Sequence, residues 1–347
     1  MRITLIANPS ATGTSEQRID RVRAELADTI DTEVFVTASR DEAVARARDA
    51  TQHRHDAVVV IGGDGTVNAA LNGMLGENID ADPADLPALG IIPGGHANVF
   101  AHALGLPREV PQAASLIRES LTTRQSHTVG LGRANDRWFA LNAGLGIDAE
   151  VISSVEDLRQ RGLPVSPAVY LAGLAKSWVQ AHRWSSPMHI RVASSNGAVH
   201  DLRDMVFVIV QNTAPWTMLG DLPLHASARA SLLAGLDVVA MESLSAATMV
   251  RILGSVLTGG GIAGDSGDAE SSRPSSARPP RPPKPPKPEA IVLHDISRIH
   301  ITAQKPVPVQ IDGDLWRPCT ELTLVGHPHA VRVLAPAPLG LDPGGHG

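Results

Sequence analysis

The chain has 347 residues, a formal net charge of −6, and 43% hydrophobic but only 3% aromatic residues. This length allows two domains with mainly aliphatic cores, and the negative charge argues against a nucleic-acid binder held by a general basic field. Cys319 is the single cysteine, which excludes an intramolecular disulfide and a thiolate zinc cluster. No segment reaches the ~18 uninterrupted apolar residues of a membrane span. We therefore expect a cytoplasmic protein that at most contacts a membrane surface.

The first hundred or so residues alternate between strand-like and helix-like segments. Ile3–Ala7 predicts a strand, which a small-residue loop from Asn8 to Thr14 connects to a helix near Ser15. A second strand at 32–37 and a charged, alanine-rich helix at 41–50 follow. This alternation indicates a doubly wound parallel sheet. Ligands of such sheets bind beyond the carboxyl ends of the strands.

The segment Ala57–Asn72 carries the strongest functional signal. It begins as a β-branched strand, typical of a sheet buried on both faces. Three glycines between 62 and 65 then allow a tight turn and close approach of a ligand, and we expect a helix with Thr66 as its N-cap. Such a helix start favours a phosphate. Asp64 would repel bare phosphate, so the pattern predicts Mg²⁺ carried by a nucleotide; the alternative is a plain turn with Asp64 as a cap.

A third strand, loop and helix junction follows the glycine turn. Leu89–Ile92 reads as a strand, residues 93–98 as a glycine-rich loop, and Val99 and Phe100 open the next helix. The carboxyl ends of parallel strands share one edge of the sheet, so the three junctions are expected to converge on one nucleotide.

The second part of the chain, after about residue 128, indicates strands without regular crossover helices, and we interpret it as an antiparallel β-sandwich. The segments with strand character are 138–143, 188–192, 204–210, 236–241, 299–302, 307–311, 322–325 and 331–334. Helices are expected at 166–183 and 245–257. The predicted domains are an α/β nucleotide-binding domain at 1–128, which the segment 326–340 would complete, and the sandwich at 129–325.

The proline-rich segment Gly259–Glu289 is unlike the rest of the chain. Proline at this density prevents regular hydrogen-bonded structure, so we expect a disordered, solvated insertion with polyproline II character. An SH3-type partner and a weak attraction of its basic residues to anionic lipid are the alternatives to a plain loop insertion.

The chain resembles the diacylglycerol kinase catalytic-domain family through several motifs that occur in the same order along the sequence. This family comprises soluble bacterial lipid kinases related to sphingosine and ceramide kinases. The motifs are Asn8-Pro9, the Gly62–Asn68 turn, Pro93–Ala101, Asn142–Ala149 and Gln310–Asp314. NAD kinases and phosphofructokinases share the glycine turn, whereas the later motifs in this order resemble lipid kinases only.

The resemblance implies an ATP- and Mg²⁺-dependent kinase that phosphorylates diacylglycerol or a sphingoid-like lipid at a membrane surface, with no nucleic-acid partner. Asp314 corresponds to the family's catalytic Glu, and Asp64 would also serve catalysis. Asp64 and Asp312 would contact the nucleotide-bound Mg²⁺. The implied nucleotide contacts are Asn8, Pro9, Ser10, Ala11, Thr12, Thr37, Gly62, Gly63, Asp64, Gly65, Thr66, Val67, Asn68, Gly95, His96 and Asn98.

The chain departs from the family's pattern at three positions. Asp314 is one methylene shorter than Glu, His96 replaces a threonine, and Ala234 lacks the oxygen ligand of a secondary structural Mg²⁺. These departures keep a nucleotide- or lipid-binding pseudokinase open as an alternative, and the shared glycine turn keeps open an NAD kinase-like soluble kinase. The sequence leaves the lipid unnamed and is compatible with a homodimer.

Overall fold

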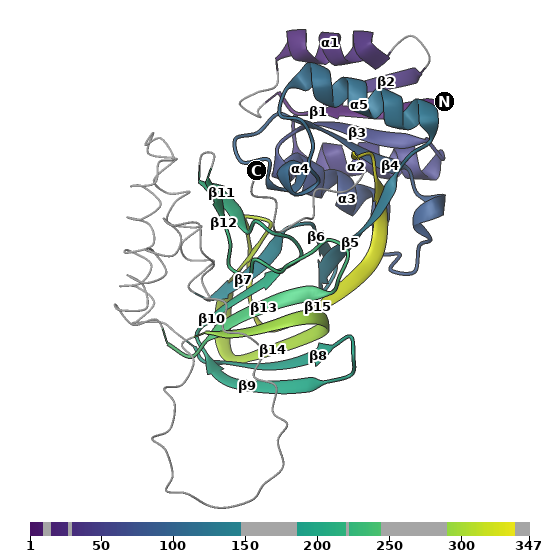
Figure 1. Cartoon of the computed structure of the whole chain (residues 1–347). Coiled ribbons are helices and arrows are strands. Elements are labelled where there is room, and N and C mark those ends of the chain that lie inside the picture. The colour runs from purple at the N-terminus through teal and green to yellow at the C-terminus, as the bar shows by residue number, and fades with distance from the viewer. Residues whose placement is uncertain (10–14, 27–29, 147–185, 220–221, 244–289, 337–347) are drawn as a thin grey trace, which may run out of the picture.

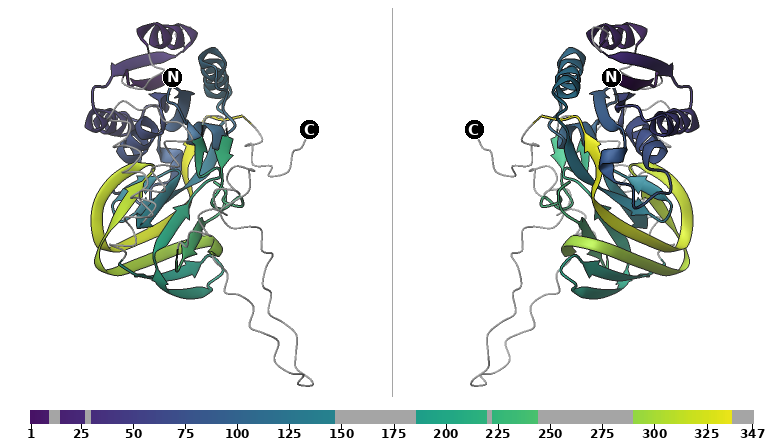
Figure 2. Two further views of the ribbon diagram at one scale, coloured as in Figure 1. Left: turned by 90° about the vertical axis from the view of Figure 1, so that its left-hand side faces the viewer. Right: turned by 90° about the vertical axis from the view of Figure 1, so that its right-hand side faces the viewer.

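The computed structural model describes residues 1–9, 15–26, 30–146, 186–219, 222–243 and 290–336, which form a helix-covered N-terminal lobe and a strand-rich C-terminal lobe (Figure 1). Figure 2 shows this division from two sides. The helices expected at 166–183 and 245–257 and the proline-rich insertion at 259–289 lie outside the described residues.

A parallel sheet in the order β4–β3–β1–β2 forms the centre of the N-terminal lobe. Its strands are β1 (Arg2–Ala7), β2 (Asp31–Val36), β3 (Ala57–Gly62) and β4 (Ala88–Pro93). Every residue of β3 and β4 is buried, which explains why their sequences are continuously apolar.

Helices cover both faces of this sheet, as a doubly wound lobe requires. The apolar faces of α1 (Glu16–Leu26) and α5 (Val110–Thr123) pack on one face of the strands. Those of α2 (Arg40–Gln52) and α3 (Asp64–Leu75) pack on the other. In α1 the buried residues are Ile19, Val22 and Leu26, whose helical spacing places them on one stripe. Among the described residues, no helix is both long and apolar enough to cross a membrane.

The C-terminal lobe is rich in antiparallel strands, as expected, but the predicted sandwich is not confirmed. Strands β13, β10, β7 and β14 form a closed ring of pairings, because the first part of β14 pairs with β13 and its last part pairs with β7. The strands of this lobe are β5 (His127–Ala134), β6 (Arg137–Phe139), β7 (Asn142–Gly146), β8 (Met188–Ser194), β9 (Val199–Met205), β10 (Phe207–Gln211), β11 (Thr217–Leu219), β12 (Leu222–Leu224), β13 (Leu236–Met241), β14 (Ile291–Ile311) and β15 (Asp314–Val333).

Two long strands join the lobes. The sequence analysis expected two short strands within each of β14 and β15, at 299–302 and 307–311 and at 322–325 and 331–334. The structure instead continues each strand through shifts in register. The end of β15 enters the N-terminal sheet, where Val333 pairs in parallel with Leu89 (Figure 1). One sheet therefore runs through both lobes, and β15 begins at the Asp312–Asp314 motif.

Candidate active site

The glycine turn leads into α3 earlier than expected. Helix α3 begins at Asp64 with Gly63 as its N-cap and no side-chain cap, so the predicted N-cap at Thr66 is wrong. Thr66 instead lies inside the first helical turn, and its hydroxyl accepts a hydrogen bond from Asn8 Nδ2 at 3.4 Å. The first amides of a helix have no intrahelical acceptor. This turn therefore directs the start of a helix toward the carboxyl end of β3, where an anion would bind.

Asp64 connects the glycine turn to the third loop. Its carboxylate accepts hydrogen bonds from the amides of Val99 and Phe100, both at 3.0 Å. These amides open the short helix α4 (Val99–Ala103), so Asp64 caps a neighbouring helix rather than its own. Loss of water contact raises the pKa of Asp64, and the two amide bonds oppose that rise.

The other predicted nucleotide contacts fall into two groups. Pro9, Gly65 and His96 are exposed around the glycine loops, whereas Val67 and Asn68 are buried. Asn98 holds its own loop closed, because its side chain accepts from the Gly95 amide at 2.8 Å and donates to the Gly95 carbonyl at 2.6 Å. The backbone amides of Asn8 and Thr37 donate to Ile61 and Ala7 and so tie the ends of β1, β2 and β3 together. Ser10, Ala11 and Thr12 lie outside the described residues.

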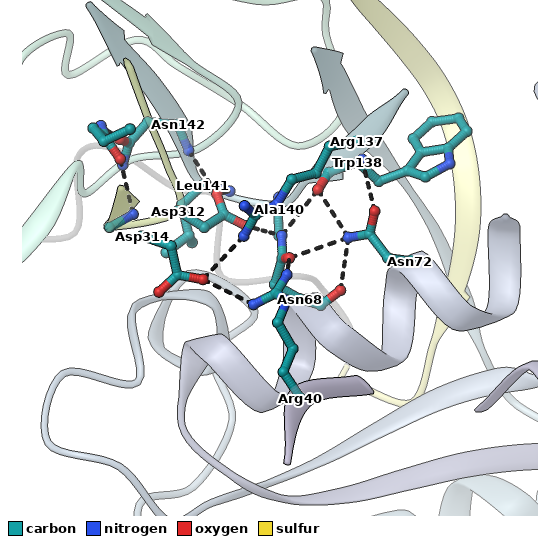
Figure 3. A network of polar contacts seen from close by, with 12 residues as sticks. Arg40, Asn68, Asn72, Arg137, Trp138, Ala140, Leu141, Asn142, Asp312 and Asp314 are labelled. Carbon is teal, nitrogen blue, oxygen red and sulfur yellow. Dashed lines mark hydrogen bonds and ion pairs between the residues drawn. The ribbon is translucent and has the colours of Figure 1, made fainter. Parts of the chain in front are cut away.

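Asp312 holds the two lobes together through a buried carboxylate (Figure 3). It accepts hydrogen bonds from the amides of Ala140, Leu141 and Asn142, at 2.9 to 3.1 Å. A fourth hydrogen bond comes from Asn68 Nδ2 on α3, at 2.6 Å. Burial outweighs these four donors and raises the pKa of Asp312 to about 6. Asn68, expected as a nucleotide contact, is fully buried and acts within this interlobe network instead.

Asp314 is the accessible carboxylate of the same motif. Its side chain is 47% exposed, and its Oδ2 atom accepts from Arg40 Nη1 at 2.8 Å and from Arg137 Nη2 at 2.9 Å. Arg40 also donates to Asn68 Oδ1. Figure 3 shows the two guanidinium groups reaching Asp314 from different lobes. The sequence analysis missed both arginines, because neither stands in a recognisable motif; the position of Arg40 shortly after Thr37 is the only available signal.

A small cavity connects these groups. It has a volume of about 160 Å³, and its lining includes Asp64 and Val99 from the glycine loops and Gln310, Asp312 and Gly313 from the turn between β14 and β15. The two motifs that the sequence analysis selected, far apart in the chain, thus face one space. A larger cavity of about 360 Å³ lies around Asp56, Ala88 and Arg332, at the opposite ends of the same parallel strands.

The residues present fit a nucleotide better than a protein-held metal ion. Glycine is required where the glycine turn and the third loop meet, because a Cβ on Gly95 would lie 2.7 Å from the Gly63 Cα atom. Within the described residues, no cluster of three or more His, Cys, Asp or Glu side chains could hold a metal. The carboxylates of Asp64 and Asp312 already accept hydrogen bonds. The loops therefore suit phosphate groups, and Mg²⁺ would depend mainly on the nucleotide for its ligands.

Comparison with known proteins finds relatives for the N-terminal part of the chain. Residues 2–134 match the family model of the diacylglycerol kinase catalytic domain. The resemblance inferred from the motifs is therefore confirmed for the N-terminal lobe and β5. The diacylglycerol kinase of Staphylococcus haemolyticus is 31% identical over 143 residues, which are 41% of this chain and 40% of that protein. That of Staphylococcus saprophyticus is 30% identical over 41% of this chain and 43% of its own length.

The matched segments span less than half of these diacylglycerol kinases, and a structural comparison extends the likeness to both lobes. A diacylglycerol kinase structure from Bacillus anthracis aligns with 97% of this chain and 98% of its own, with a TM-score of 0.62 and 19% identity. At this identity the likeness concerns the fold. The arrangement of a helix-covered lobe and a strand-rich lobe is therefore shared with a diacylglycerol kinase.

Proposed function

We propose that this protein is an ATP-dependent lipid kinase that phosphorylates the hydroxyl group of diacylglycerol or of a related, sphingoid-like lipid at a membrane surface. The observation that carries the proposal is the position of Asp314. It is the accessible carboxylate of its motif, and the adjoining Asp312 and Gly313 line a cavity shared with the glycine loops. Phosphoryl transfer requires loops that position the phosphates and a carboxylate near the attacking hydroxyl. The match to a kinase catalytic domain and the position of Asp314 support both parts.

ATP would bind with its phosphates against the amides of Gly63, Asp64 and Gly65 and against the loop that contains Gly95. Nucleotide-bound Mg²⁺ would supply charge neutralisation of the phosphates. In this arrangement Asp64 acts by fixing the two loops at the distance that the phosphates need, since its carboxylate joins the glycine turn to α4.

The reaction is a direct transfer. The lipid hydroxyl oxygen bonds to the γ-phosphorus as the bond from that phosphorus to the β–γ bridging oxygen breaks, and ADP leaves. The hydroxyl proton passes to Asp314, whose Oδ1 atom makes no hydrogen bond within the described residues. Arg40 and Arg137 hold the other oxygen and so orient the shorter side chain that stands in place of glutamate.

The test is ADP release from the full-length protein with ATP and Mg²⁺, together with detection of phosphorylated product. Mixed micelles of diacylglycerol, ceramide or sphingosine should each be compared with detergent alone and with NAD. Lipid-dependent ADP release with a phosphorylated lipid product supports the proposal. Phosphorylation of NAD would instead indicate the soluble-kinase alternative, and nucleotide binding without turnover would indicate a pseudokinase.

A further inference from the structure

Two arginines from different lobes converge on one carboxylate oxygen. Arg40 opens α2 in the N-terminal lobe, and Arg137 opens β6 in the C-terminal lobe, yet both donate to Asp314 Oδ2. Their side chains are 35% and 17% exposed. Partly exposed ion pairs contribute little to stability. Stabilising the contact between the lobes therefore does not by itself explain why two arginines bind the same carboxylate oxygen.

Two positive charges are held close together at this point. One carboxylate faces two guanidinium groups, while the neighbouring Asp312 directs its charge to four N–H donors. Burial lowers the pKa of Arg40 and the charge of Arg137 lowers it further, against the opposing effect of Asp314, Asp312 and Asp41. The two cations therefore repel each other, and an additional anion between them would be favourable.

Arg137 also has unused hydrogen-bond donors. A guanidinium group carries five N–H donors, and within the described residues Arg137 makes one side-chain hydrogen bond, to Asp314. Its Nε atom is buried and has no partner there. Because a buried donor without an acceptor is unfavourable, such a group requires an explanation. A ligand that brings several acceptor oxygens would supply one.

The chemistry of the missing acceptor is that of a phosphoryl group. Its oxygens match the planar fork of a guanidinium, and its negative charge suits a pair of neighbouring cations. Arg40 is hydrogen-bonded to Asn68 on α3, the helix that starts at the glycine turn. Arg40 is therefore tied to the helix whose first turn would receive the nucleotide phosphates in the proposed function, and Arg137 meets it at Asp314.

We propose that Arg40 and Arg137 bind the phosphoryl group that is transferred, exchanging their bonds with Asp314 for bonds to phosphate oxygens. The inference rests on the proposed lipid kinase function and assigns two phosphate-binding residues to it. In the free protein the arginines hold Asp314 in place. With the phosphoryl group bound they neutralise its oxygens and leave Asp314 to the lipid hydroxyl. The phosphoryl oxygens can come from the nucleotide before transfer or from the lipid phosphate after it.

The experiment uses full-length Arg40→Gln and Arg137→Gln variants, which keep a polar side chain and remove the charge and the guanidinium fork. Isothermal titration measures the affinities of the non-hydrolysable ATP analogue AMP-PNP and of ADP, both with Mg²⁺. A parallel assay measures binding of dioleoyl phosphatidate in mixed micelles. Arg48→Gln is the matched control, because Arg48 lies on the same helix, is exposed, and makes no hydrogen bond or ion pair within the described residues.

We expect each active-site variant to bind AMP-PNP about 10- to 100-fold more weakly, the loss that follows from removing a charged hydrogen bond. ADP affinity should be unchanged, since ADP lacks the terminal phosphate. A loss confined to phosphatidate would also support the inference and identify the lipid phosphate as the ligand. The matched Arg→Lys variants, which keep the charge but not the fork, should recover part of the affinity.

The inference is overturned if neither AMP-PNP nor phosphatidate binding changes, or if ADP and AMP-PNP weaken equally. A loss of the same size in Arg48→Gln would overturn it too, because it would show a general charge effect. Thermal unfolding shows whether each Gln variant is still folded. If one is not, the binding measurements on the corresponding Lys variant test the inference instead. If the wild-type protein phosphorylates no lipid, the proposed function fails, but the AMP-PNP and ADP comparison still tests the two arginines.

Discussion

Gly63 and Gly95 pack backbone against backbone where the glycine turn meets the third loop, and a Cβ on Gly95 would lie 2.7 Å from the Gly63 Cα atom. Gly95→Ala should therefore lower the free energy of unfolding by about 1–3 kcal/mol, the usual cost of overpacking. Gly65→Ala is the matched control, because a Cβ there has nothing within 4 Å. Its stability should be unchanged or higher by about 0.4–1 kcal/mol. Urea denaturation checks both, and equal losses would contradict the packing argument.

Asp64→Ala should abolish phosphoryl transfer and leave the protein folded. The amides of Val99 and Phe100 would lose their acceptor, so we expect the free energy of unfolding to fall by about 1–2 kcal/mol. Turnover and urea denaturation of the same preparation separate the two effects. Near-native turnover in this variant would show that fixing the two loops is not needed for the reaction.

Asp314→Asn keeps the shape of the side chain and removes its basicity. Turnover should fall by about 10²- to 10⁴-fold, the contribution ascribed to general acid–base catalysis, with little change in ATP affinity. Asp314→Glu restores the residue of the resembled family. It should be at least as active as the wild type if Arg40 and Arg137 accommodate the longer acid. Unaltered lipid phosphorylation by the Asn variant would remove the proposed role.

Asp312 should give stability a distinctive dependence on pH. Its pKa is about 6 in the folded protein, against ~3.9 for an unfolded aspartate. An acid with a raised folded pKa binds its proton more tightly when folded, so its contribution is fully present below pH ~4 and is lost as pH rises through about 6. The difference in unfolding free energy between wild type and Asp312→Asn should fall by about 3 kcal/mol over that range. A pH-independent difference in urea denaturation would contradict this.

Deletion of Ser266–Pro288 should leave the melting temperature almost unchanged. The flanking strands are already held together, because Ala240 of β13 pairs with Ile291 of β14. Loop closure costs only about 0.6 kcal/mol for each doubling of loop length, so shortening the connection changes little. Differential scanning fluorimetry of the deletion variant provides the measurement. A large fall in melting temperature would mean that the segment packs against the protein or pairs with it.

Most strands, helices and loops of the N-terminal lobe follow from the sequence because their signals are local, although the sequence analysis made no prediction for α5. The buried run at Ala57–Ile61 and the glycines after it predict a strand and a turn without reference to any other part of the chain. The expected strand at 138–143 is divided into β6 and β7 in the structure. Three amides around this break bind Asp312, a distant acceptor that the local pattern does not reveal.

The sequence by itself therefore determined the glycine-rich loops and the doubly wound lobe, since strand propensity and glycine geometry depend on neighbouring residues. The resemblance to the kinase family singled out Asp314 as the carboxylate to examine. Only the tertiary structure decided that β14 closes a ring of strands and that Asp64 caps α4. It also decided that Arg40 meets Asp314, 274 positions away along the chain. Such contacts depend on how distant strands pair, and that pairing is fixed by the packing of the whole molecule.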